Sequence, residues 1–255
     1  MTRRIVALIG IGLVGGFLSG VFGIGGGILM VPLFMFILKL DQRRASALSL
    51  TAVLPAAIVG SITYGIEGHV DLLASAFIAA GGIVGALVGT RLLRSLPLGW
   101  LRWLFVGLLV IVAIRMFIDI PPGTQSIEFT VPSVVGLIAL GLVVGIASGL
   151  FGIGGGVIVV PALIGLFGVP ELVAKGTSLL AMVPTSITGT LANTRAKLVH
   201  PVDGLIVGAA AALAAYPGVL VAHTLPARLS NVLFAFIVLA AAVQLAIRAW
   251  RLRRA

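Results

Sequence analysis

Residues Ser19 to Pro32 read SGVFGIGGGILMVP, and residues Ser148 to Pro161 read SGLFGIGGGVIVVP. The second stretch begins 129 positions after the first. Ten of the fourteen aligned positions are identical, and the other four exchange one apolar residue for another. Glycine lowers helix propensity and frees the backbone, so each cluster predicts a break in an apolar helix. Inside a membrane, irregular backbone is tolerated only where protein or a water-filled cavity surrounds it. The two breaks are therefore the first place to look for function.

The composition is that of an integral membrane protein. Of 255 residues, 60% are hydrophobic and 9% charged, and the mean hydropathy is +1.26, far from the averages of a soluble domain. Apolar runs long enough to cross a lipid bilayer recur between short polar stretches. The net charge of +10 would suit a nucleic-acid partner, but the basic residues stand at the ends of apolar runs, as anchors of membrane helices do. We expect no nucleic-acid partner, and the absence of cysteine excludes disulfides and thiolate chemistry.

The sequence predicts an all-α polytopic membrane protein made of two repeats in one membrane domain. Residues 1–120 form the first transmembrane repeat, 121–132 the linker and 133–255 the second repeat. Further pairs at the same offset, such as Pro55 with Pro184 and Gly89 with Gly218, indicate two copies of one unit. The expected helices are 5–22, 28–39, 44–64, 71–93, 99–118, 133–151, 156–168, 172–194, 203–224 and 229–250.

Two of these segments, 28–39 and 156–168, are too short to cross a membrane, because 12 helical residues span only about 18 Å. We interpret them as short or re-entrant helices that begin at the glycines. The fold prediction is therefore about eight full spans plus two short helices.

The positive charges predict that the repeats are inverted. If each glycine break reverses the chain, fourteen of the 17 lysines and arginines fall on one side, which the positive-inside rule makes cytoplasmic. Only Arg115, Lys175 and Arg228 remain on the other side. Inverted repeats are common in secondary transporters. We expect a multi-pass protein of the plasma membrane with both termini in the cytoplasm.

The glycine motif predicts an anion site and not a nucleotide site. It lacks the Lys-Ser/Thr of a phosphate-binding loop, and Ile28 and Val157 replace the third glycine of a dinucleotide fingerprint. What remains is the N-terminus of a short helix, where unpaired amides and the helix dipole favour an anion. The alternative is that the glycines only allow helices to cross closely. The amides belong to Gly25, Gly26, Gly27, Gly154, Gly155 and Gly156.

A few polar side chains could join such a site, although each hydroxyl could equally bond a carbonyl one turn back in its own helix. The candidates are Ser19, Ser148, Ser49, Thr51, Thr177, Ser178, Thr185 and Asn193. Carboxylates lie only in loops or at helix ends, which argues against a proton relay across the membrane. His69, His200 and His223 lie near helix ends and are not spaced as a metal cluster. We therefore expect no metal, no cofactor and no enzymatic activity, since no nucleophile and base are assembled.

The doubled SGxFGIGGGxxxVP motif and the segment KGTSLLAMVPTSITG at Lys175 to Gly189 resemble the sulfite exporter TauE/SafE family, also called the TSUP family. The resemblance covers nearly the whole chain. It implies a secondary transporter that moves a small sulfur-containing or organic anion, of the sulfite, sulfonate or thiosulfate class, often outward. The alternatives are an anion channel and a membrane subunit that only scaffolds partners, and a homo-oligomer is compatible with the sequence. The first half departs from the second at Ala47-Leu48-Ser49, where the second has Gly176-Thr177-Ser178.

Overall fold

The computed structural model describes residues 2–117 and 127–254, and within them the regular secondary structure is ten α-helices. The ten predicted helical segments are confirmed to within a few residues at each end. Of the predicted linker, 121–132, residues 121–126 lie outside the described residues, and its last two residues already belong to α6. The helices are α1 (Thr2–Phe22), α2 (Gly27–Ile37), α3 (Gln42–Ile66), α4 (Leu72–Ser95), α5 (Leu98–Phe117), α6 (Val131–Phe151), α7 (Gly156–Phe167), α8 (Glu171–Arg195), α9 (Pro201–Thr224) and α10 (Ala227–Arg254).

Six of the described helices are long and apolar enough to cross a membrane, namely α1, α3, α4, α6, α9 and α10. Of the roughly eight full spans predicted, these six are therefore confirmed by length and composition. The helix α8 has 25 residues, but it contains serines, threonines and an asparagine and is not among these six. The described apolar part of α5 is shorter than a full span. As predicted, α2 and α7 are short, with 11 and 12 residues.

Stripes of glycine and alanine hold the long helices together. On α6, Gly141, Gly145 and Gly149 lie directly against the backbone of α4, and on α1, Gly12, Gly16 and Gly20 lie against α9. These stripes have the four-residue spacing that lets membrane helices approach closely. The two contacts are equivalent, because α6 is the copy of α1 and α9 is the copy of α4. In each contact, a helix of one half packs on a helix of the other half.

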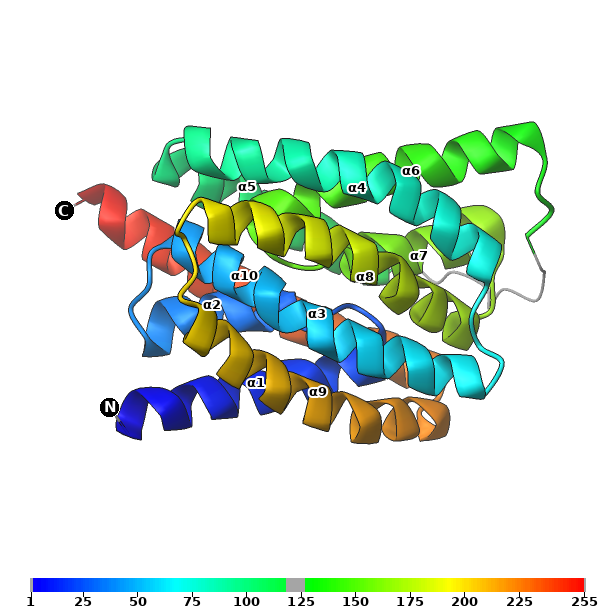
Figure 1. Cartoon of the computed structure of the whole chain (residues 1–255), viewed down its shortest axis with the longest axis horizontal. Helices are drawn as coiled ribbons and strands as arrows, with labels where there is room; N and C mark the ends of the chain where they lie inside the picture. The colour runs from blue at the N-terminus through cyan, green and yellow to red at the C-terminus, as the bar shows by residue number, and fades with distance from the viewer. Residues whose placement is uncertain (1, 118–126, 255) are drawn as a thin grey trace.

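Equivalent helices of the two halves run in opposite directions in Figure 1, where α1 leads away from the N-terminus and α6 leads back toward that end. The helices α3 and α8 are opposed in the same way. The short helix α2 turns back toward the end that holds both termini, and α7 turns toward the other end.

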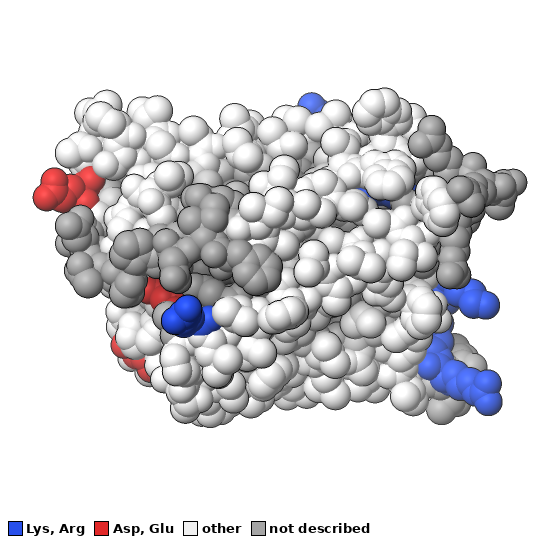
Figure 2. Space-filling model, turned by 180° about the vertical axis from the view of Figure 1, so that it is seen from behind, with Lys and Arg blue, Asp and Glu red and all other residues white. Residues whose placement is uncertain are grey.

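Charge is divided between the two ends of the bundle. Figure 2 shows acidic residues gathered at one end and most of the visible lysines and arginines at the other. Between the ends the surface is largely uncharged, and apolar side chains in the middle of helices, such as Val84, Ile111 and Leu213, are exposed. An exposed apolar belt between charged ends is the surface that a lipid bilayer covers.

Candidate functional site

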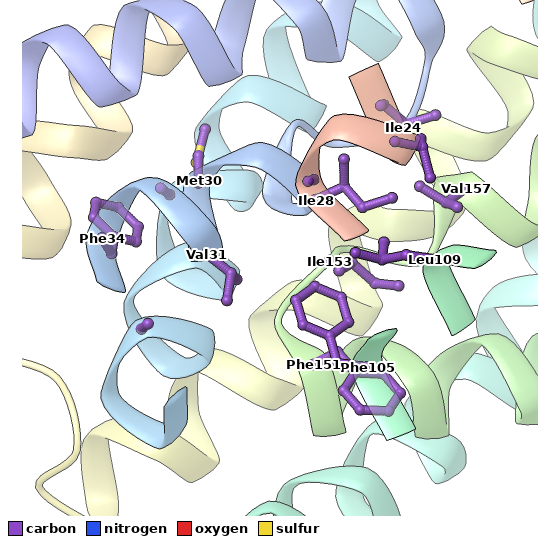
Figure 3. Close-up of a cluster of buried hydrophobic side chains, with 14 of the residues drawn as sticks. Ile24, Ile28, Met30, Val31, Phe34, Phe105, Leu109, Phe151, Ile153 and Val157 are labelled. Atoms are coloured by element: carbon purple, nitrogen blue, oxygen red, sulfur yellow. The ribbon is translucent and has the colours of Figure 1, made fainter. Parts of the chain in front are cut away.

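The two glycine breaks lie against each other near the middle of the bundle. A Cβ atom added to Gly27 would lie 2.7 Å from Cα of Ile153, and one added to Gly156 would lie 2.5 Å from Cα of Ile24. Each break thus touches the other through equivalent residues. Figure 3 shows Ile24 beside Val157 and Ile153 beside Leu109, in one cluster of buried side chains.

Aromatic pairs flank the breaks in the same reciprocal way. Phe22, at the end of α1, packs on Phe234 of α10, and Phe151, at the end of α6, stacks on Phe105 of α5. The ring centroids are 5.1 Å apart in both pairs. The end of each broken helix is therefore fixed by an apolar anchor, and this leaves the glycines between the anchors to set the path of the chain.

Gly25 and Gly154 face the same two side chains. Their φ angles are both +77°, a conformation that side chains with a Cβ rarely adopt. A Cβ on Gly25 would lie 3.0 Å from both Met182 Sδ and Val53 Cγ1, and one on Gly154 would lie 2.8 Å from the same atoms. Val53 and Met182 occupy equivalent positions on α3 and α8, 129 residues apart. This pair covers the point where the breaks meet.

The amides at the two helix starts remain free. Within the described chain, the N–H groups of Gly25 to Gly27 and of Gly154 to Gly156 donate to no acceptor, while the carbonyls of Gly26 and Gly155 accept the first bonds of α2 and α7. The free donors at the N-terminus of a helix are those that can hold an anion.

The meeting point is closed in this structure. The cavity next to the first break, lined by Ile24 and Lys175 among others, measures about 10 Å³. A single water needs about that much space, so a small oxyanion cannot enter until side chains or helices move. The sequence predicted converging helix ends around a cavity. The helix ends converge, and the side chains of Val53 and Met182 pack on them.

A buried ion pair stands at the first break. Lys175 of α8 is 2% exposed and packs on Gly23, whose added Cβ would lie 2.6 Å from Cα of Lys175. Its Nζ pairs with Glu171, one turn earlier, and donates a hydrogen bond to Ser230 Oγ at 3.2 Å. Among the described residues that are buried, Lys175 is the one that carries a charge.

At the second break the equivalent positions are neutral. Ser46 of α3 packs on Gly152, whose added Cβ would lie 2.6 Å from Cα of Ser46. Gln42 stands where the second half has Glu171, and the side chains of Gln42 and Ser46 are fully buried. The side-chain polar atoms of Gln42, Ser46 and Asn193 have no hydrogen-bond partner in the described chain. Since a buried polar group without a partner is costly, these groups are candidates for contact with a ligand.

The predicted polar site residues fall into three groups. Thr51 and Thr185 donate to the carbonyl four residues earlier in their own helices, and Thr177 accepts from the amide of Asp71. Ser49 donates to the carbonyl of Gly152 at 2.8 Å and so ties α3 to the second break. The third group is buried without a hydrogen-bond partner in the described chain, and comprises Ser19, Ser148, Ser178 and Asn193.

Sequence reasoning missed several residues at the breaks. It placed Lys175 among the outer anchoring charges, whereas the structure buries Lys175 against Gly23. The signal was present, because Glu171 and Lys175 are four residues apart on one helix.

Sequence reasoning also treated the three histidines as separate residues near helix ends. The structure brings His69 and His223 together with Glu67 and leaves His200 at a different site. Sequence spacing could not reveal that cluster, because its members lie on α9 and on the α3–α4 connection.

A basic cavity opens at the end of the bundle that holds the N-terminus. It measures about 500 Å³ and is lined by Arg4, Arg44, Lys197, His200 and Asp203. The carboxylate of Asp203 is paired with Arg4. Leu48 and Thr194 also line this cavity, and they adjoin Ser49 and Asn193 in the chain. The cavity therefore leads from the charged end of the bundle toward the second break.

The fold and the paired breaks define a polytopic membrane protein whose candidate site is built from two copies of one motif. The chain belongs to the sulfite exporter TauE/SafE family, since the model of that family matches residues 1–116 and 137–255.

Bacterial relatives of the chain are named as probable membrane transporter proteins. A probable membrane transporter protein of Xylella fastidiosa (strain Temecula1) is 30% identical over 97% of each chain. The probable membrane transporter protein YunE of Bacillus subtilis is 29% identical over 74% of this chain and 77% of its own. No solved structure matches the chain. The protein is thus an integral membrane protein of a family of probable membrane transporters.

Proposed function

We propose that the protein is a secondary transporter that moves a small sulfur-containing or organic anion, of the sulfite, sulfonate or thiosulfate class, across the plasma membrane by alternating access. The observation that carries this proposal is the reciprocal contact of the two glycine breaks. Two helix N-termini with free amides meet there, and one bundle of helices can rock against the other around that point.

The chemistry at the breaks favours an anion. The free amides and the positive ends of the α2 and α7 dipoles can attract an anion even without help from a buried cation. Lys175 adds a positive charge beside Gly23, and its partner Glu171 neutralises that charge in the closed state. Ser46 packs on Gly152 of the second break, and together with Gln42 and Asn193 it supplies polar side-chain atoms that have no partner in the described chain. Together these groups suit a compact oxyanion.

The closed centre and the basic cavity indicate how the anion moves. Positive groups that line a cleft raise the local concentration of anions, so the cavity lined by Arg4, Arg44 and Lys197 serves as the cytoplasmic entrance. The substrate then passes Leu48 and Thr194 toward the breaks, and Val53 and Met182 must move aside to receive it. Entry from the cytoplasm fits export, the direction that we propose.

The membrane topology that we propose is an inverted repeat with both termini in the cytoplasm. Ile66 and Arg195 occupy equivalent positions at the ends of α3 and α8, 129 residues apart, and both are exposed. The chain has no cysteine, so Ile66→Cys and Arg195→Cys each introduce a single thiol. An impermeant thiol reagent applied to intact cells should label Ile66→Cys, and Arg195→Cys should react only after the cells are opened. Labelling of both from one side would refute the inverted topology.

Transport itself is tested with purified protein in liposomes. Uptake of sulfite, taurine-like sulfonates, thiosulfate, sulfate and small carboxylates is compared with and without a proton gradient. We expect saturable uptake of one class of anion, accelerated by unlabelled anion on the opposite side. Uptake without such acceleration would indicate a channel, and no uptake of any anion would indicate a subunit that only scaffolds partners.

A further inference from the structure

Three side chains with metal-binding atoms gather at the end of the bundle opposite the N-terminus. Glu67 follows α3, His69 lies in the connection to α4, and His223 lies in the last turn of α9. Glu67 Oε2 pairs with His223 Nε2 and lies 3.9 Å from His69 Nδ1. One ligand atom from each residue lies within 4.8 Å of the other two.

The local structure fixes the two imidazoles in this arrangement. The amide of His69 donates to the carbonyl of Tyr64 at 2.9 Å, and Gly68 allows the turn with a φ of +76°. The ring centroid of His223 lies 5.8 Å from that of Tyr64 and 5.2 Å from that of His69. Nδ1 of His69 is buried and has no hydrogen-bond partner in the described chain. A buried imidazole nitrogen aimed at a carboxylate without bonding it is available to a metal.

We propose that Glu67, His69 and His223 bind a divalent transition-metal ion of the Zn²⁺ type. Two imidazole nitrogens and one carboxylate oxygen form a common set of protein ligands for zinc, with water in the fourth position. Zinc-ligand bonds of about 2.0 to 2.2 Å require small shifts of the ligand atoms, because His69 Nδ1 must come closer to Glu67 Oε2 and His223 Nε2, which already pairs with Glu67 Oε2, must move slightly away from it. Rotation of the partly exposed side chains of Glu67 and His223 can supply this movement. The hard ions Ca²⁺ and Mg²⁺ prefer sites made only of oxygen, so they do not suit this set.

A metal ion at this cluster joins the two halves of the molecule. Glu67 and His69 belong to the first repeat, whereas His223 belongs to the second. Tyr64, one turn before Glu67, donates its hydroxyl to the carbonyl of Gly20 at 2.9 Å, three residues before the first break. The bound ion therefore fastens the end of α3 to the end of α9 and holds this end of the bundle closed. The binding itself does not depend on which substrate the protein transports.

The test measures metal binding directly on the full chain in detergent, purified with a peptide tag that contains no histidine. Zn²⁺ is titrated by calorimetry, and Co²⁺ is used as a spectroscopic substitute whose absorption reports the ligand geometry. We expect one Zn²⁺ ion per chain and Co²⁺ bands that Zn²⁺ displaces. His69→Ala and His223→Ala each remove one metal ligand, so each should weaken Zn²⁺ binding by about ten-fold or more.

His200→Ala is the matched control, because His200 lines the basic cavity at the other end of the bundle and should leave Zn²⁺ binding unchanged. Glu67→Gln keeps the size of the side chain and removes its charge, so it tests the site if an alanine variant fails to fold. The proposal is overturned if the wild-type chain shows no saturable binding. It is also overturned if Glu67→Gln and the histidine variants bind Zn²⁺ as tightly as the wild type.

Discussion

The first and second glycine breaks share one backbone and differ in the side chains around them. Both have glycines at positive φ in equivalent positions, both carry an aromatic anchor with rings 5.1 Å apart, and both face Val53 and Met182. The first break packs on Lys175, which is paired with Glu171, and the second packs on neutral Ser46, preceded by Gln42. The duplicated backbone therefore builds the frame of the site, and single substitutions have made its two sides chemically different.

A second difference between the breaks lies one layer further out. Tyr64 is fully buried and bonds the carbonyl of Gly20 at the end of α1, close to the first break. Asn193 occupies the equivalent position in the second half, and both of its side-chain polar atoms lack a partner in the described chain. At this pair of equivalent positions the polar group of the first half is thus satisfied by the protein, while the amide of Asn193 has no partner in the described chain.

The largest expected effect comes from filling the space that both breaks share. In Gly25→Ala and Gly154→Ala the new methyl group meets Met182 and Val53 and strains a backbone at φ +77° by about 1 to 2 kcal/mol. We expect both variants to insert into the membrane and to show no measurable anion flux in liposomes. Normal flux in either variant would exclude that break from the transport site.

Gly107→Ala is the matched control for these variants. Gly107 lies within α5, and a Cβ added there meets nothing within 4 Å. Alanine also favours a helix over glycine by about 1 kcal/mol. The control should therefore transport at the wild-type rate and be at least as stable as the wild type. It shows whether replacing any glycine impairs transport, or only replacing a glycine where the two breaks meet.

The duplicated backbone was predictable from sequence because it rests on local patterns. Two copies of one motif fixed the offset, and apolar runs of defined length fixed the helices. The four-residue spacing of Gly141, Gly145 and Gly149 is visible in the sequence, and it accounts for the close crossing that Gly145 makes with α4. The short helices α2 and α7 followed from helix length alone, since the rise per residue is constant.

The side-chain differences between the breaks were harder to predict because they depend on contacts between distant segments. Gln42 and Ser46 look like ordinary polar residues near a helix start, and only the folded structure shows that both are buried without hydrogen-bond partners in the described chain. The cluster of Glu67, His69 and His223 joins residues more than 150 positions apart. An alignment of the chain with itself would have shown one useful signal, the change from Glu171 and Lys175 to Gln42 and Ser46.

The second-largest expected effect comes from removing the positive charge at the first break, which tests whether that charge is needed for transport. Lys175→Met leaves Glu171 without its partner, which should lower the free energy of unfolding by about 2 to 3 kcal/mol, less than for a fully buried pair. Anion flux should fall by about ten-fold or more, since a loss of 1.4 kcal/mol in substrate affinity already gives that factor. Thermal unfolding in detergent and liposome flux measure the two quantities separately.

The double variant Glu171→Gln with Lys175→Ser gives the first break the side chains of the second. Stability should recover, because no charge is left unpaired, while flux should stay low. Arg228→Met is the control, since it removes an exposed positive charge from the same end of the bundle and should change neither quantity. Normal flux in the double variant would mean that the ion pair only supports the fold.

The smallest expected effect separates the two residues of the outer layer, Tyr64 and Asn193. A buried amide without partners costs about 1 to 3 kcal/mol, so Asn193→Leu should unfold at the same temperature as the wild type or higher, while its anion flux falls several-fold. Tyr64→Phe removes the hydrogen bond to Gly20, so it should lose about 1 kcal/mol of stability and keep most of its flux. The directions of the changes in stability and flux are more informative than their sizes. Replacing a residue that only packs should not raise stability and at the same time lower transport. If Asn193→Leu is instead less stable and transports normally, the free polar groups of the second break belong to the fold, and the functional difference between the breaks must lie with Lys175 alone.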